Sequence, residues 1–142
     1  MKIEITVLGN PKAQKRHRST NVGKFIRNYD PSAGDKADFL ALVHDKAPQK
    51  PFAGAISLQA GFYIPYPKKF LRTGKFEGQL KPNAPEYCIT RPDADNYAKM
   101  VLDCLNKIFY NDDSQVAVLT VSKKYSFKPR TEIIIEEINE TA

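Results

Sequence analysis

The sequence predicts an α+β protein in which a mixed four-stranded sheet is packed by two main helices. Four segments have the apolar patterns of strands, and two others repeat apolar residues at helical spacing. A chain of 142 residues with 42% hydrophobic side chains can bury one core but hardly two. We therefore expect residues 1–142 to form a single domain without an internal linker.

The first expected strand is residues 3–7, where Ile3, Ile5 and Val7 alternate with polar side chains. Glycine and proline then break the alternation, and residues 12–27 contain six Lys or Arg side chains and no acid. We expect this basic segment to be an arm that contacts phosphates, and an ordinary solvated loop is the alternative. Its candidate contacts are Lys12, Lys15, Arg16 and Arg18.

The first expected helix follows residues 30–32, whose sequence Asp-Pro-Ser favours a helix start. Ser32 with Asp35 makes a weak capping box, and Asp30 could cap instead. Apolar residues recur at helical spacing as far as residue 47, so we expect this helix to cover the sheet. Residues 56–64 then show the clearest alternation in the chain and predict a second strand.

Residues 65–90 show neither the alternation of a strand nor the apolar spacing of a helix. They contain four prolines and two glycines. A structureless stretch of this length in a small domain is usually functional or disordered. Its cations are interleaved with aromatic rings, a combination that nucleic-acid-binding loops use. The cations proposed as contacts are Lys68, Lys69, Arg72 and Lys75. The alternative is a loop whose rings merely cover the core.

A second helix is expected after Pro92, because apolar residues recur at helical spacing as far as residue 109. At about 100° per residue, four polar residues fall within about 80° of one another on one stripe of this helix. They are Asp95, Lys99, Asp103 and Asn106. Asp93 can meet Asp95 only if the chain before the helix is extended or forms a cap.

Two more carboxylates, Asp112 and Asp113, follow this helix. The helix would be about four turns long, which separates them from Asp95 by about 20 Å. Either neighbouring packing bends the chain back, or the missing carboxylate comes from a paired chain. Converging carboxylates beside basic segments would suit a metal ion held against a phosphate. The alternative is that the first pair caps the helix and the second pair forms a turn.

The C-terminal part completes the expected sheet with strands at residues 116–124 and 131–138. Net charge is +6, with residues 11–27 and 65–81 carrying +10 between them and the remainder −4. This concentration favours a polyanionic partner such as nucleic acid. No apolar run approaches the roughly 18 to 20 residues of a membrane span, and the N-terminus alternates, so we expect a cytoplasmic protein. Two cysteines are too few for a disulfide framework.

The motifs resemble the signature of the RusA family of Holliday junction resolvases. The resemblance rests on residues 9–18 (GNPKAQKRHR), 91–99 (RPDADNYAK) and 112–116 (DDSQV), together with Asp103 and Asn106. It covers the chain from end to end, and the two acidic runs are its specific part. Residues 65–90 match no fixed pattern of the family.

This resemblance implies a RusA-like fold, a homodimer and a Mg²⁺-dependent endodeoxyribonuclease, with Mn²⁺ as a substitute metal. The enzyme would cut two strands of a four-way DNA junction symmetrically, by attack of metal-activated water. The implied metal-binding and catalytic acids are Asp93, Asp95 and Asp113, and Lys99 is the implied catalytic lysine. Asp103 and Asp112 are implied as helpers. No small-molecule cofactor and no membrane are expected.

Two other classes of function remain open from the sequence. A non-catalytic nucleic-acid-binding module would use the basic segments and leave the acids as caps and turns. A metal-dependent phosphohydrolase would act on small phosphates or RNA without regard to branch structure. An assay for cleavage of branched DNA with Mg²⁺ distinguishes these two classes from the junction endonuclease.

Overall fold

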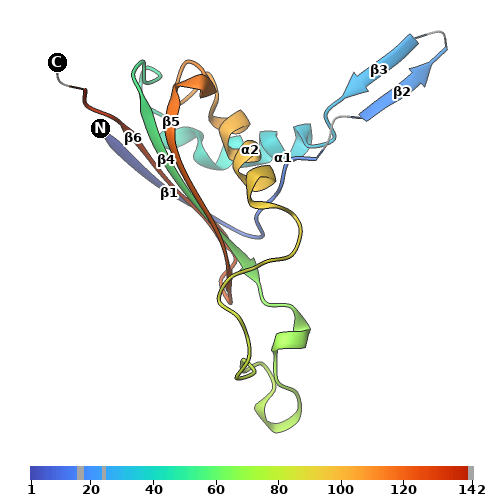
Figure 1. Ribbon diagram of the computed structural model, residues 1–142. Coiled ribbons are helices and arrows are strands. Elements are labelled where there is room, and N and C mark those ends of the chain that lie inside the picture. Colours follow the sequence, from blue (N-terminus) through green and yellow to red (C-terminus); the bar gives the residue numbers. More distant parts are fainter. Residues whose placement is uncertain (16–17, 24, 141–142) are drawn as a thin grey trace.

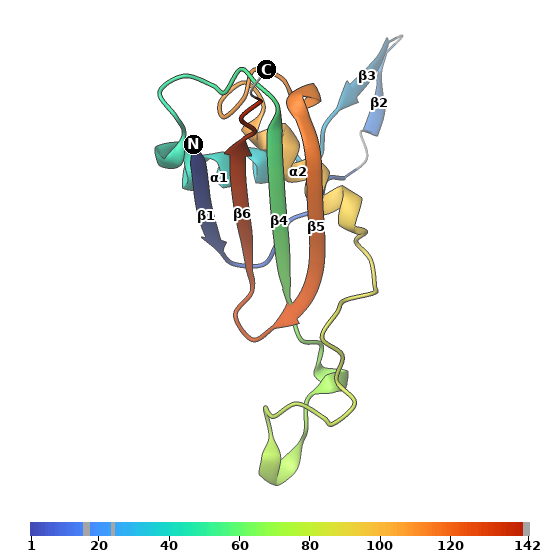
Figure 2. The same cartoon turned by 60° about the vertical axis from the view of Figure 1, so that its left-hand side comes forward.

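The computed structural model describes residues 1–15, 18–23 and 25–140. Within these residues, four strands form one sheet in the order β1-β6-β4-β5 (Figure 2). The strands are β1 (Lys2–Leu8), β4 (Ile56–Pro65), β5 (Val116–Ser126) and β6 (Arg130–Glu137). β4 and β5 run parallel and the other neighbours antiparallel, so the sheet is mixed and the predicted α+β class is confirmed.

One face of the sheet is buried by two helices, α1 (Ala33–Val43) and α2 (Ala94–Leu105), which lie on the same side of it (Figure 1). The alternation seen in the sequence explains this, because period two sends every second side chain to the same face. Alternate residues of the strands are accordingly buried: Ile3, Ile5, Ile56, Leu58, Ala60, Phe62, Ile133 and Ile135. No helix in the described parts of the chain has the length and apolar content to cross a bilayer.

α2 is the more deeply packed helix, and the ring of Tyr97 stacks on Phe62 of β4 with centroids 5.0 Å apart. It ends at Leu105, earlier than the apolar spacing to residue 109 indicates. Lys107 has a left-handed φ of 69°, and the chain turns back there. The turn lets Phe109 and Tyr110 bury completely, and the Tyr110 hydroxyl donates to the Leu102 carbonyl at 2.8 Å. Burying a large side chain contributes roughly 1.5–3 kcal/mol to stability. This gain exceeds what another turn of the helix would contribute.

The start of α1 differs from the predicted capping box. Ser32 occupies the N-cap position but makes no capping bond, and its hydroxyl accepts from the backbone N–H of Lys15 at 2.7 Å. The Asp30 carboxylate accepts from the backbone N–H of Ser32 at 2.9 Å. The residues that begin α1 are therefore used to hold the basic segment. α1 ends at Val43, and a short 3-10 helix, η1 (His44–Lys46), follows it.

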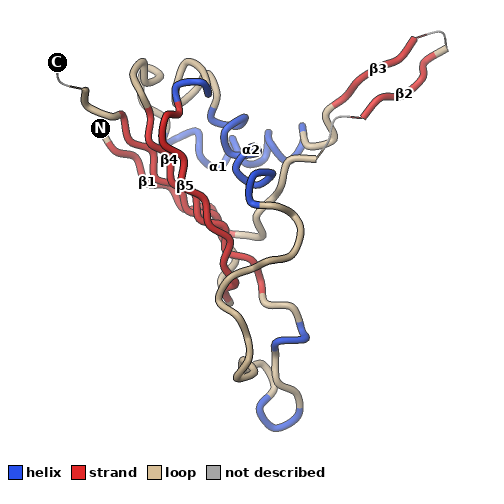
Figure 3. The backbone as a smooth tube through the Cα atoms, in the orientation of Figure 1, coloured by secondary structure: helices blue, strands red, loops and turns tan. Residues whose placement is uncertain are grey.

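The basic segment, which the sequence predicts to be a phosphate-contacting arm, contains a β-hairpin. β2 (Arg18–Val22) pairs antiparallel with β3 (Phe25–Tyr29), and the hairpin projects from the body (Figure 3). Its turn includes Gly23, whose φ of 62° is the left-handed conformation that glycine adopts without strain. The high charge of this segment masks the short strand pattern of β2 and β3. The two strands can be recognised only when they are seen paired with each other.

Residues 66–87 make a second projection, with two short 3-10 helices, η2 (Lys68–Phe70) and η3 (Gly74–Phe76). The chain returns beside the lower half of β5. There the N–H of Cys88 donates to the Lys123 carbonyl at 3.1 Å, and the N–H of Tyr125 donates to the Glu86 carbonyl at 2.8 Å. This pairing covers the outer edge of β5 only around residues 123–125.

Candidate active site

Asp93 and Asp95 stand at the beginning of α2 with both carboxylates exposed to solvent. Asp93 is the N-cap residue in an extended conformation (φ −71°, ψ 155°), and its side chain makes no capping bond. Asp95 lies in the first turn and accepts a hydrogen bond from the backbone N–H of Asn96 at 3.0 Å. The extended backbone that the sequence required of Asp93 is thus present. Most of the oxygen lone pairs of this pair remain available to a ligand.

Lys99 lies one helical turn after Asp95 and is exposed. Among the residues that the structure describes, no carboxylate lies within ion-pairing distance of its ammonium group, whereas Lys36 and Lys107 are both paired. An exposed cation without an internal partner is free to meet an anion from solution. Lys99 and the carboxylate pair therefore form a polar group on the solvent side of a buried helix.

Lys123 on β5 fixes the segment that leads into this site. Its Nζ donates to the carbonyls of Thr90 at 2.7 Å and Pro92 at 2.8 Å. Pro92 directly precedes Asp93, so these two bonds set the direction in which the chain enters α2. Lys123 was not among the site residues predicted from the sequence. Its signal was a cation at a core-facing position of an apolar strand, since β5 pairs Lys123 with the buried Phe62 of β4.

The entrance to α2 borders a hollow of about 520 Å³ lined by Arg91, Pro92, Asp93 and Asn96. The root of the hairpin lies against the same turn, because the backbone N–H of Gln14 donates to the Asn96 carbonyl at 2.9 Å. Figure 1 shows the yellow lower end of α2 between the roots of the hairpin and of the loop projection. A ligand at Asp93 and Asp95 would therefore lie between two basic parts of the chain.

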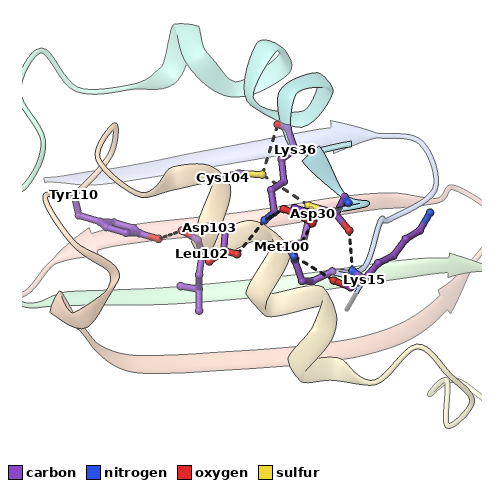
Figure 4. A network of polar contacts seen from close by, with 10 residues as sticks. Lys15, Asp30, Lys36, Met100, Leu102, Asp103, Cys104 and Tyr110 are labelled. Atoms are coloured by element: carbon purple, nitrogen blue, oxygen red, sulfur yellow. Dashed lines mark hydrogen bonds and ion pairs between the residues drawn. The ribbon is translucent and has the colours of Figure 1, made fainter. Parts of the chain in front are cut away.

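Asp103 is not directed to this site. Its carboxylate pairs with the Lys36 ammonium at 3.2 Å, and Lys36 pairs with Asp30 at 2.6 Å, so a lysine of α1 bridges α2 and the hairpin root (Figure 4). Burial by itself would lower the pKa of Lys36, but hydrogen bonds and charge attraction from the two carboxylates raise the pKa above its ordinary value. The thiol of Cys104, next to Asp103, has its pKa raised to about 11 by burial.

Asp112 caps η4 (Asp113–Gln115), the turn between α2 and β5. Its carboxylate accepts from the backbone N–H of Ser114 at 3.1 Å and from the Ser114 hydroxyl, and these bonds lower its pKa. Gln115 completes the capping box by accepting from the Asp112 N–H and donates to the carbonyls of Phe52 and Gly54. Asp112 therefore has a structural role that accounts for its position.

Asp113 is half-buried, and in the described chain its carboxylate has no hydrogen-bond or ion-pair partner. It lies past the opposite end of α2, whose 12 residues span about 18 Å from the Asp93 end. Among the described residues, no three His, Cys, Asp or Glu side chains are close enough to hold a metal ion together. One chain thus presents two of the three expected acids in one place.

The basic residues predicted to contact phosphates lie on both projections. Lys12 and Lys15 are exposed at the hairpin root; Arg16 lies outside the described residues, and of Arg18 only the backbone, in β2, is described. On the loop, Lys68 is exposed, Lys69 lies 5.0 Å from the Phe70 ring centroid, and Arg72 lies over the Phe76 ring at 4.0 Å. Lys75 lies 5.9 Å from the same ring. Such pairs preform a surface of cations and rings.

The fold and this site define a class of protein, a small α+β nucleic-acid enzyme with exposed carboxylates between basic projections. A model of the family described as endodeoxyribonuclease RusA matches residues 9–136, and the chain belongs to this family, as the motifs indicated. Members of the family are endonucleases that act on branched DNA junctions. The chain is also 37% identical over 144 residues to the uncharacterized protein YqaN of Bacillus subtilis (strain 168), covering 96% of this chain and 97% of that protein.

Proposed function

We propose that this protein is a Mg²⁺-dependent resolvase that acts as a homodimer and cuts four-way DNA junctions by paired, symmetric strand cuts. The observation that carries the proposal is the exposed pair of Asp93 and Asp95 at the start of α2, one turn from Lys99, which has no ion-pair partner among the described residues. Carboxylates used only for capping would accept the N–H groups of the first turn. Asp93 makes no such bond, which supports a role in binding.

The donor set fits a hard divalent cation, because carboxylate oxygens are the ligands that Mg²⁺ and Mn²⁺ prefer. Asp93, Asp95 and Asp113 would hold the ion. When bound, it supplies positive charge against the scissile phosphate and makes water a better nucleophile at neutral pH. Without such a cation, two exposed acids would repel a phosphate, so the pair makes chemical sense on a DNA-binding surface only with a metal.

The other residues of the site position the substrate. Lys99 donates hydrogen bonds to the scissile phosphate and offsets the charge that develops on its oxygens during attack. Lys123 keeps the chain before Asp93 in place through the carbonyls of Thr90 and Pro92. The phosphates of the junction arms contact the cations of both projections, Lys12, Lys15, Arg16, Arg18, Lys68, Lys69, Arg72 and Lys75.

The dimer follows from two requirements. A four-way junction offers two symmetry-related strands, and a two-fold dimer presents one active site to each. Each site also needs a third acid, which the chain's own Asp113 is too distant to provide. The partner subunit's Asp113 supplies it.

The proposal is tested on a four-way junction and on a linear duplex of the same sequence, with Asp95→Asn beside the parent. Asp45→Asn, an exposed acid in η1, serves as the matched control. The parent and the control should each make two symmetric cuts in the junction with Mg²⁺ and none in the duplex. Asp95→Asn should bind the junction at least as tightly, because a repulsive charge is gone, yet leave it uncut.

Three results would overturn the proposal. Undiminished cutting by Asp95→Asn would remove the acid from the mechanism. Binding without cutting by the parent would favour a non-catalytic module. Equal cutting of branched and unbranched substrates would favour a general phosphohydrolase.

A further inference from the structure

The outer part of the loop projection (residues 66–87) has a fixed backbone. It pairs as a small hairpin, in which the N–H of Arg72 donates to the Gln79 carbonyl at 2.7 Å and the N–H of Lys81 donates to the Phe70 carbonyl at 2.8 Å. Two glycines with φ of 70° and 87° help to form the turn at its tip, a conformation that glycine adopts without strain. The tip is therefore formed before any ligand binds.

Aromatic rings attach the base of the projection to the sheet. Tyr66 stacks on Tyr125 of β5 with ring centroids 5.1 Å apart, and Phe70 lies 5.8 Å from the same ring. Tyr66 also lies 5.3 Å from Phe127, in the turn between β5 and β6. These contacts hold the projection in the direction seen in Figure 2, beyond the ends of β4 and β5. The rings at the base thus pack against the body of the protein.

Phe76, at the tip, is arranged differently. It belongs to η3, is 41% exposed and is not part of the hydrophobic core of the described chain. The Arg72 guanidinium lies over its ring at 4.0 Å from the centroid, whereas the Lys75 ammonium is 5.9 Å away. Both backbone groups of Arg72 are bonded within the hairpin, so its side chain starts from a fixed point beside the ring. Phe76 therefore presents to solvent a ring that is backed by a cation.

The covered face of this ring limits what can bind to it. An aromatic side chain that intercalates lies between two bases and needs both of its faces. The guanidinium occupies one face of Phe76, so a base can stack only on the other. A paired base inside a duplex is already stacked on both sides, whereas an unpaired base has a free face. The tip therefore suits one unpaired base better than a base step of a duplex.

The charges around the ring suit the strand that carries such a base. Residues 65–81 contain five basic side chains and one acidic side chain. Lys75, beside the ring, and Lys68 and Lys69, near the base of the projection, are exposed. Cations that follow the phosphates, combined with a ring that stacks a base, are the means by which proteins bind single strands.

We propose that Phe76, backed by Arg72, is a stacking platform for one unpaired DNA base, and that the loop projection is a binding site for single-stranded DNA. The inference rests on the proposed function for its place at a branch point, but the contact itself requires only a strand with an unpaired base. A junction with unpaired nucleotides at its branch point is therefore bound more tightly than a fully paired one.

Fluorescence anisotropy with EDTA present tests the platform by comparing a single-stranded oligothymidylate with a fully paired duplex. Phe76→Leu keeps an apolar side chain but removes the ring, and it should weaken binding of the oligothymidylate about 10-fold and leave duplex binding unchanged. Phe76→Tyr keeps the ring and should bind both as the parent does. Lys75→Gln is the matched control for charge and should weaken both. Equal oligothymidylate affinity of Phe76→Leu and the parent would overturn the inference.

Photocrosslinking locates the contact directly. A junction with one unpaired 5-iodouracil at its branch point, irradiated with the parent, should crosslink to the peptide that contains Phe76, and Phe76→Leu should lose this product. A crosslink found only on peptides of the β2–β3 hairpin would overturn the inference.

These experiments need no metal and no cutting, so their failure differs from that of the proposed function. A parent that cuts junctions, with oligothymidylate binding unaffected by Phe76→Leu, would exclude the platform and leave the function intact. A parent that never cuts junctions, but whose oligothymidylate binding depends on Phe76, would exclude the function and leave the platform intact.

Discussion

The backbone N–H of Gln14 donates a 2.9 Å hydrogen bond to the carbonyl of Asn96, which ties the root of the hairpin to the first turn of α2. The same root is held from its other side by Asp30, which accepts from the Gln14 side chain at 3.3 Å and from Lys36 at 2.6 Å. A DNA arm held by the hairpin is therefore placed at a set distance from Asp93 and Asp95.

Lys36 is the centre of this connection, and Lys36→Met should leave the carboxylates of Asp30 and Asp103 without their shared cation. We expect the free energy of unfolding to fall by about 1–3 kcal/mol, because both carboxylates are largely shielded from water. Urea unfolding at neutral pH measures the change. Lys46→Met, an exposed lysine of η1, is the matched control and should unfold as the parent does.

The same residue predicts a pH dependence with a definite sign. The folded-state pKa of Lys36 is raised, so its contribution to stability is complete below the pKa of the unfolded chain and is lost as pH rises through the folded-state pKa. The melting temperature of the parent should therefore fall more steeply above about pH 10 than that of Lys36→Met. Parallel curves for the two proteins would contradict the assignment.

The two neighbouring acids after α2 should separate into a structural and a functional residue. Asp112→Ala removes the cap of η4 and should lower the melting temperature, because the backbone N–H and the hydroxyl of Ser114 lose their acceptor. Asp113→Ala removes a carboxylate without a partner in the described chain and should leave the melting temperature unchanged while abolishing junction cutting. Thermal denaturation and a cleavage assay on both variants check this. A loss of cutting in Asp112→Ala and a loss of stability in Asp113→Ala would show that the structural and functional roles are the other way round.

The sheet and its covering helices were predictable because each element buries one face. Burial of one face makes apolar residues alternate along β1 and β4 and recur at helical spacing along α1 and α2. Charge patterns gave the two basic projections, but the hairpin was missed, since its strands pair with each other and have no buried alternation. The end of α2 was missed for another reason. Phe109 and Tyr110 fit the helical wheel, and only the turn at Lys107 shows that they are buried by a reversal of the chain.

The candidate site was predictable to a similar extent. Local spacing placed Asp95 and Lys99 on one stripe and required an extended Asp93, and both conditions are met. Asp103 fits the same stripe but is taken by Lys36, a residue 67 positions away in the chain. Contacts of this kind depend on tertiary packing, which no single segment encodes. Lys123 was missed because its role is visible only beside Thr90 and Pro92.

Lys123→Met should reduce cutting by about 10- to 100-fold, the usual cost of removing a residue that orients a metal ligand. Its two hydrogen bonds to the carbonyls of Thr90 and Pro92 hold the chain before Asp93, so we expect the loss in kcat and in Mg²⁺ affinity, with junction affinity little changed. Lys124→Met is the control: its ammonium group lies 3.6 Å from Glu86, and alternation along β5 places its side chain on the opposite face from Lys123. Equal loss in both variants would indicate a general effect of charge.

Mixing two inactive variants tests whether each site takes acids from both chains. If the partner's Asp113 completes the site, a heterodimer of Asp95→Asn and Asp113→Asn has one site with every acid present and should nick one strand of the junction. If all acids came from one chain, both sites of that heterodimer would be damaged and no nicking would return. The mixture of Asp95→Asn with Asp93→Asn is the control, because both acids lie on the same α2 end and neither arrangement restores a site. Nicking in the first mixture alone is the expected outcome; its absence, with heterodimers verified by mass, would place Asp113 outside the partner's site.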